Sequence, residues 1–267
     1  MQSYQNPQGY AGGYAQTQAE VDQGLRAFML GVYNNMVLGL AISALVALGV
    51  NKLAVASSLE AAGRNGAGNA VRIAKDMFLT QFGITLYTTP LMWVVALAPL
   101  AFIFLFSFGA NRLSAAGARM LFFAFAAVMG ASLSTLLIRY TGASITQTFF
   151  VTAAAFGGLS LYGYTTTRSL SGLGTFLTMA LIGLVLASIV NIFLASGALQ
   201  FVISAAGVVI FAGLTAYDTQ KLKEMYLYGD YDAETGAKAS IFGALTLYLD
   251  FINMFQFLLS FMGSRNE

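Results

Sequence analysis

The chain has 267 residues, of which 58% are hydrophobic and only 9% are charged. A soluble domain carries about a quarter of charged residues, so 13 Lys+Arg and 11 Asp+Glu are too few for a water-facing surface, and the composition predicts a polytopic membrane protein. A net charge of +2 gives no reason to expect nucleic-acid binding, and the lack of cysteine and histidine excludes disulfides, thiolate chemistry and the commonest general base.

The first 25 residues predict a disordered polar tail. Gln, Gly, Tyr and Asn dominate residues 2–18 and leave no periodic apolar face. The apolar run that follows is too long for a signal peptide, and no basic residue precedes it before Arg26. We therefore expect this run to be a retained membrane helix.

Seven apolar segments follow, each close to the ~20 residues that a transmembrane helix needs. Their apolar runs are unbroken, whereas strands of a membrane barrel would alternate. We expect an all-α, seven-helix membrane domain over residues 26–263 and a short C-terminal tail at 264–267. The segments are expected at about Ala27–Val50, Leu86–Phe108, Met120–Ile138, Ile145–Thr165, Leu173–Leu194, Leu199–Tyr217 and Ser240–Met262.

The long loop in this pattern covers residues 51–81, and three glycines loosen its middle. Five apolar residues after the glycines share one helical face, opposite Arg72, Lys75 and Asp76. This spacing suits a helix on the membrane surface, and it equally suits an extension of the second spanning helix. The apolar residues are Ala70, Ile73, Ala74, Met77 and Phe78.

The distribution of Lys and Arg over the short loops predicts a cytoplasmic N-terminus and a C-terminus outside. Long segments cross a membrane largely regardless of charge, so the loop 51–81 is left out of the comparison. Only Arg139 and Arg265 then lie on the outer side. The cytoplasmic side holds Arg26, Arg112, Arg119, Arg168, Lys221, Lys223 and Lys238.

Two aspartates lie inside apolar segments, where ionisable residues are costly and usually mark function. Asp250 is near the middle of the last segment, and Asp218 is about one turn inside the end of the sixth. The two segments are consecutive and joined by the short polar loop Gly229–Lys238, so they are expected to be antiparallel neighbours. Both carboxyl groups are therefore predicted to meet on the cytoplasmic side of the bundle.

Polar residues at helical spacing accompany these aspartates. They are Thr215 and Lys221 beside Asp218, and Thr246 and Asn253 beside Asp250. The alternative interpretations are an interfacial Asp218 paired with Lys221, and an Asp250 that makes a structural hydrogen bond between helices. Asn191 forms a similar polar stripe with Ser188 on the fifth segment, and there a structural role is favoured.

A pair of close carboxyl groups titrates as one unit and can share a proton. When both are ionised at ~4 Å, they repel by about 1–4 kcal/mol for an effective dielectric constant between ~80 and ~20. That energy is sufficient to shift a two-state gate. The sequence thus predicts Asp218 and Asp250 as pH sensor and gate, and as hard-oxygen ligands for Ca²⁺. No resident cofactor is expected.

Two motifs resemble those of the Bax inhibitor-1 family of membrane proteins. Leu247–Phe255 (Leu-Tyr-Leu-Asp-Phe-Ile-Asn-Met-Phe) is similar to the family's last-helix motif, and Ala216–Lys221 (Ala-Tyr-Asp-Thr-Gln-Lys) to its sixth-helix motif. The resemblance covers about Ala27–Gly263. It implies a seven-helix fold with the last helix central, a bacterial inner-membrane location and a pH-sensitive Ca²⁺ leak gated by the aspartate pair. It also implies a latch arginine, for which Arg112 is the nearest candidate.

We therefore expect a passive, pH-sensitive Ca²⁺ or cation leak channel, with the lipid bilayer and Ca²⁺ or H⁺ as its partners. The alternative is a membrane regulator, without transport, that binds a quality-control protease or a stress-response partner through the polar tail. An intramembrane aspartyl protease also pairs two aspartates. Such enzymes carry Gly-x-Gly before the second aspartate, where this chain has Leu247-Tyr248-Leu249, so no enzyme is expected.

Overall fold

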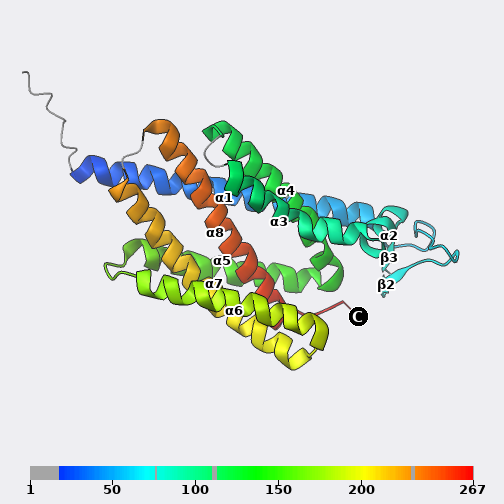
Figure 1. Ribbon diagram of the computed structural model, residues 1–267. Helices are drawn as coiled ribbons and strands as arrows, with labels where there is room; N and C mark the ends of the chain where they lie inside the picture. Colours follow the sequence, from blue (N-terminus) through cyan, green and yellow to red (C-terminus); the bar gives the residue numbers. More distant parts are fainter. Residues whose placement is uncertain (1–17, 76, 110–112, 230–231, 267) are drawn as a thin grey trace, which may run out of the picture.

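The computed structural model of the protein describes residues 18–75, 77–109, 113–229 and 232–266 as an elongated helical bundle with a small sheet at one end (Figure 1). The helices are α1 (Gln18–Ala54), α2 (Gln81–Thr88), α3 (Leu91–Gly109), α4 (Ala115–Arg139), α5 (Gly142–Thr165), α6 (Ser171–Leu194), α7 (Gly197–Tyr228) and α8 (Ala233–Met262). Within these ranges, six helices are long and apolar enough to span a membrane, and the count is seven if the bent pair α2 and α3 is taken as one span. The predicted all-α membrane fold is confirmed.

Helix α1 begins earlier than the sequence suggested. Residues 18–25 were assigned to the polar tail, but they form the first two turns of α1. Leu25 is buried there, and the Phe28 ring lies 5.3 Å from the ring of Tyr226 on α7. Packing against α7 thus stabilises a segment whose own composition is polar. The rest of the predicted tail, residues 1–17, lies outside the described residues.

The second spanning segment is broken. Helix α2 ends at Thr88, α3 begins at Leu91, and the two are bent by 64°. Pro90 lies at the break, and a proline disfavours helical backbone at the residue before it. Thr89 accordingly adopts an extended conformation, with φ −102° and ψ 170°.

The loop 51–81 forms a small antiparallel sheet, so both predicted helical arrangements are wrong. Strand β3 (Met77–Leu79) lies between β1 (Val55–Ala56) and β2 (Arg72–Ala74). The turn before β2 uses the left-handed backbone of Gly68, with φ +79°, and Leu79 is buried beside the end of α1. The apolar residues whose spacing resembled a helical face lie in β2, in β3 and at the bridge between Arg64 and Ala70.

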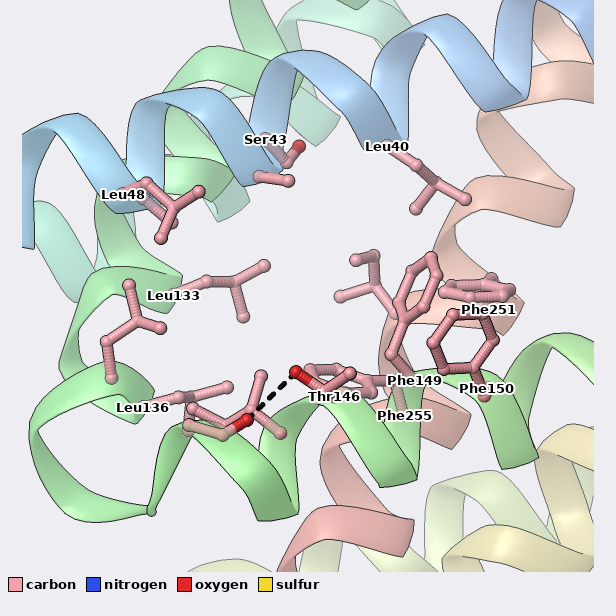
Figure 2. A pocket seen from close by; sticks show the side chains of 16 residues that line it. Leu40, Ser43, Leu48, Leu133, Leu136, Thr146, Phe149, Phe150, Phe251 and Phe255 are labelled. Atoms are coloured by element: carbon pink, nitrogen blue, oxygen red, sulfur yellow. Dashed lines mark hydrogen bonds between the residues drawn. The ribbon is translucent and has the colours of Figure 1, made fainter.

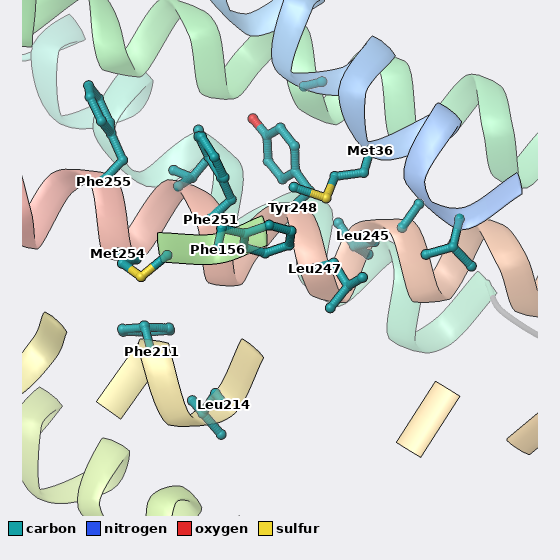
Figure 3. Packing of buried hydrophobic residues seen from close by; sticks show 14 of the residues in the cluster. Met36, Phe156, Phe211, Leu214, Leu245, Leu247, Tyr248, Phe251, Met254 and Phe255 are labelled. Carbon is teal, nitrogen blue, oxygen red and sulfur yellow. The ribbon is translucent and has the colours of Figure 1, made fainter. Parts of the chain in front are cut away.

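Helix α8 lies at the centre of the bundle, as predicted. It packs against α1, α4, α5 and α7, and its apolar window is the most deeply buried among the spanning helices described. Figure 3 shows Leu247, Tyr248 and Phe251 of α8 among side chains of α1, α5 and α7, which are Met36, Phe156, Phe211 and Leu214. Helix α6, in contrast, packs mainly against α7 and is the most exposed span.

Contacts between helix ends fix which ends lie together. The start of α4 meets the start of α8, because the Ala115 N–H donates to Glu234 Oε1. Lys223 near the end of α7 donates to the carbonyl of Tyr164 near the end of α5. We call this the N-terminal end of the bundle, since α1 also starts there. Its described basic residues are Arg26, Arg119, Arg168, Lys221, Lys223 and Lys238.

Candidate functional site

A groove of about 650 Å³ runs between α6 and α8, with α7 as its floor. The α6 side of the groove lies at the outer surface of the bundle, because Val185 and Ile192 of α6 are 51% and 74% exposed. Most of the lining is apolar. The polar lining residues are Thr178, Ser188, Asp218, Lys221, Thr246, Asp250 and Asn253.

Asp218 and Asp250 both line this groove, and their carboxyl groups are close enough to interact electrostatically. Asp250 is only 4% exposed, and Asp218 is partly buried. Among the described residues, no N–H or hydroxyl group donates to Asp250 Oδ2. A buried carboxylate oxygen needs a hydrogen-bond donor, and here the neighbouring carboxyl group can be that donor only when it carries a proton.

The local sequence explains why these two side chains meet. Helices α7 and α8 form an antiparallel hairpin whose second helix is capped by Asp232, since the Asp232 carboxylate accepts a hydrogen bond of 2.8 Å from the Thr235 N–H. This hydrogen bond lowers the pKa of Asp232 below its usual value. The antiparallel arrangement places residues inside the end of α7 beside the middle of α8.

Lys221 lines the same groove one turn after Asp218. Its Nζ atom lies over the ring of Tyr217, 5.9 Å from the ring centre. Tyr217 in turn packs against Gly174 of α6, where any side chain would collide with its ring. Lys221 and Asp250 both line the groove with Asp218, so the pairing of an interfacial Asp218 with Lys221 stays a prediction.

The polar neighbours of the aspartates divide into two groups. Thr246 and Asn253 line the groove, and each donates to a carbonyl of its own helix, at 3.2 Å to Phe242 and 2.8 Å to Leu249. Thr215 does not line the groove; it is buried on another face of α7 and donates to the Phe211 carbonyl. The predicted latch residue Arg112 lies outside the described residues.

Asn191 connects the end of α6 to the start of α7. Its Oδ1 accepts from the Ser196 N–H, and its Nδ2 donates to Gln200 Oε1. These bonds hold the tight turn between α6 and α7, where Ala195 has a left-handed φ of 48°.

The start of α6 is held by a second amide, from α7. Gln220 Oε1 accepts from the Leu170 N–H at 2.7 Å, and Gln220 Nε2 donates to the Arg168 carbonyl at 2.8 Å. Helix α6 is therefore fixed to α7 at both of its ends by side-chain amides.

Sequence reasoning missed a second polar contact of α8. Tyr248 is completely buried, and its hydroxyl lies 2.6 Å from Ser43 Oγ on α1. Ser43 Oγ also lies 2.7 Å from the Ala126 carbonyl of α4. The available signal was a tyrosine inside an apolar helix, whose hydroxyl requires a partner when buried.

A cation in the groove would meet few charged ligands. The described part of the chain contains no group of three or more Asp, Glu, His or Cys side chains placed to bind a metal. Ca²⁺ takes about six to eight oxygen ligands. Asp218 and Asp250 would therefore need water or neutral oxygens, such as those of Thr246 and Asn253, to complete the shell.

Comparison with known proteins identifies the family of this chain. Residues 25–267, which include both aspartates, match the sequence profile described as "Inhibitor of apoptosis-promoting Bax1". The chain belongs to the Bax inhibitor-1 family. It is 44% identical to the inner membrane protein YbhL of Escherichia coli K12 over 91% of this chain and 93% of that protein. It is also 47% identical to an uncharacterized protein of Caulobacter vibrioides, over 92% of each chain.

A third relative is protein RP147 of Rickettsia prowazekii, 42% identical over 92% of this chain and 93% of that protein. The matches extend over nearly the whole membrane domain rather than over one short motif. Together with the six to seven apolar spanning helices, family membership establishes a polytopic membrane protein embedded in the lipid bilayer.

Proposed function

We propose that this Bax inhibitor-1 family protein is a pH-gated passive path for Ca²⁺ or another cation, with Asp218 and Asp250 as its gate. The observation that carries the proposal is that Asp218 and Asp250 line the same groove between spanning helices. Ionisable groups inside a membrane protein usually lie on ion pathways or proton relays.

The gate follows from the charge of the pair. With one shared proton, a hydrogen bond joins α7 to α8 across the groove. With both groups ionised, the bond is lost and the carboxylates repel by about 1–4 kcal/mol at ~4 Å. The same ionised pair attracts a divalent cation, so proton and Ca²⁺ compete for one site.

The test is Ca²⁺ flux through the purified chain in liposomes that contain a Ca²⁺ indicator, measured between pH 5 and pH 8. Asp250→Asn and Asp218→Asn should each change the size and weaken the pH dependence of the flux, because only one carboxyl group of the pair then titrates. Glu224→Gln is the matched control, since Glu224 is exposed on α7 outside the groove lining. A flux with unchanged size and pH response in Asp250→Asn would overturn the proposal.

We further propose that the protein lies in the bacterial inner membrane, with its N-terminal end in the cytoplasm. The name of the E. coli relative supports the location, and the basic residues gathered at the N-terminal end support the orientation. The chain has no cysteine, so single-cysteine variants report sidedness directly. An impermeant maleimide added to intact spheroplasts should label Ser264→Cys and not Ser169→Cys; the reverse pattern contradicts the orientation.

A further inference from the structure

On the side of α8 away from the aspartate groove, α1 and α5 face each other without close packing. Helix α1 packs on α4 and α8, whereas α5 packs on α7 and α8. The gap, which we call the α1–α5 seam, contains two cavities of about 500 and 490 Å³. Between them lies an aromatic cluster in which the Phe251 ring is 5.6 Å from the rings of both Phe149 and Phe156.

The first of these, the head cavity, lies toward the N-terminal end of the bundle. Its lining includes the exposed Arg26 and the hydroxyl-bearing Tyr33, Ser160 and Tyr164. The Tyr33 hydroxyl lies 2.6 Å from Ser160 Oγ and so joins α1 to α5. The remaining wall is apolar. A permanent guanidinium charge above an apolar wall complements an anionic headgroup that carries an apolar chain.

The second, the tail cavity, is almost entirely apolar. Figure 2 shows leucines and phenylalanines from α1, α4, α5 and α8 around it. Its two hydroxyl groups already have partners in the protein: Thr146 donates to the Gly142 carbonyl at 2.9 Å, and Ser43 contacts Tyr248. Leu48 and Phe150 are 54% and 67% exposed, so the cavity opens toward the surroundings of the helices. A hydrocarbon chain fits this lining, whereas a polar ligand would find no free partner there.

The spacing of the two cavities matches one membrane leaflet. Arg26, where the phosphate would lie, lines the head cavity and Leu40 lines the tail cavity, and fourteen helical residues span ~21 Å. Half of a bilayer of ~40–45 Å, headgroups included, is about the same length. We propose that the α1–α5 seam binds one anionic phospholipid, with its phosphate at Arg26 and an acyl chain that passes over the aromatic cluster into the tail cavity.

The first test measures lipid retention by native mass spectrometry on the delipidated full-length chain. Phosphatidylglycerol and phosphatidylcholine with the same chains are titrated separately. Arg26→Gln should weaken phosphatidylglycerol binding about fivefold and leave phosphatidylcholine unchanged, while Arg26→Lys should keep most of the binding. The matched control is Arg119→Gln, an exposed arginine at the same end of the bundle. Equal losses in Arg26→Gln and Arg119→Gln would overturn the site.

The second test locates the lipid. Trp93 is the chain's single tryptophan, so a Trp93→Phe background allows one reporter, Leu30→Trp in the head cavity or Leu40→Trp in the tail cavity. Brominated phosphatidylglycerol, at low mole fraction in phosphatidylcholine, should quench both reporters more than brominated phosphatidylcholine does. Arg26→Gln should remove this difference. Equal quenching by the two lipids, or displacement by millimolar glycerol phosphate, would refute a bound phospholipid.

Discussion

Tyr248 and Asp250 lie two residues apart on α8 but face different surroundings. Tyr248 points toward α1 and α4, where its ring packs edge-on against Phe122 and Phe125 and its hydroxyl bonds to Ser43. Asp250 points into the groove, and its Oδ2 has no ordinary donor among the described residues. The tyrosine contact is complete at any pH near neutrality, whereas the aspartate contact depends on a proton. One face of α8 is therefore an anchor and the other an adjustable contact.

The largest effect is expected when the anchor is removed. Tyr248→Ala deletes a completely buried ring, and comparable large-to-small aromatic substitutions cost about 3–5 kcal/mol. Thermal unfolding followed by size-exclusion chromatography in detergent would measure the loss. Leu227→Ala, at an exposed position of α7, is the control. A Tyr248→Ala protein as stable as this control would show that the anchor is not rigidly packed.

Removal of the hydroxyl alone should cost less. Tyr248→Phe keeps the ring contacts with Phe122 and Phe125, and Ser43 retains its contact with the Ala126 carbonyl. The expected loss is about 1 kcal/mol, the usual net value of one buried hydrogen bond. The double variant with Ser43→Ala should cost little more than either single change. Strictly additive losses would mean that the two hydroxyl groups do not interact.

On the adjustable side, Asp250→Asn should change stability by less than about 1 kcal/mol at neutral pH, because the asparagine amide can donate to Asp218 without a titrating proton. Its effect should appear as a weaker pH dependence of stability, because Asp218 alone then titrates. Unfolding temperatures of the parent chain and of Asp250→Asn, compared between pH 5 and pH 8, would measure it. If the unfolding temperatures of the two proteins changed with pH in the same way, Asp250 would not make a pH-dependent contact, and the two faces of α8 would not differ in this respect.

The smallest effect is expected at Asp232, which caps the start of α8 in full contact with solvent. Its hydrogen bond from Thr235 lowers the pKa of the folded state, so its stabilisation is present above the ordinary aspartate pKa and is lost as pH falls through the lowered value. Asp232→Ala should therefore lower the unfolding temperature slightly at pH 7 and less at pH 3. A deficit that grows on acidification would contradict this assignment.

The sequence predicted the parts of this fold that depend on one helix or on two consecutive helices. The apolar segments gave the spans, and the short polar loop before α8 indicated that Asp218 and Asp250 would be neighbours. It did not predict contacts that depend on the whole bundle. Ser43 and Tyr248 are more than 200 residues apart, and no local pattern pairs them.

Other differences arise where two local patterns compete. The apolar residues after Gly68 satisfy a helical repeat. They form strands instead because β1, which follows α1 directly, pairs with β3. Thr215 lies three residues from Asp218, yet the packing of α7 turns it toward the interior of the bundle. The sequence predicted one continuous span over Leu86–Phe108 and not the break at Pro90, and Pro99 of the same span lies inside α3 without a break.

The two amide contacts at the ends of α6 limit how the groove changes width. Gln220 hydrogen-bonds the segment before α6, and Asn191 hydrogen-bonds the turn after it. These bonds oppose an outward rotation of α6 about either end. Between these fixed points α6 rests mainly on α7. Because both ends of α6 are hydrogen-bonded, a change in the width of the groove requires the middle of the helix to bend away from α8. We therefore expect the largest displacement of α6 near its middle, beside the groove, and the smallest at its two ends.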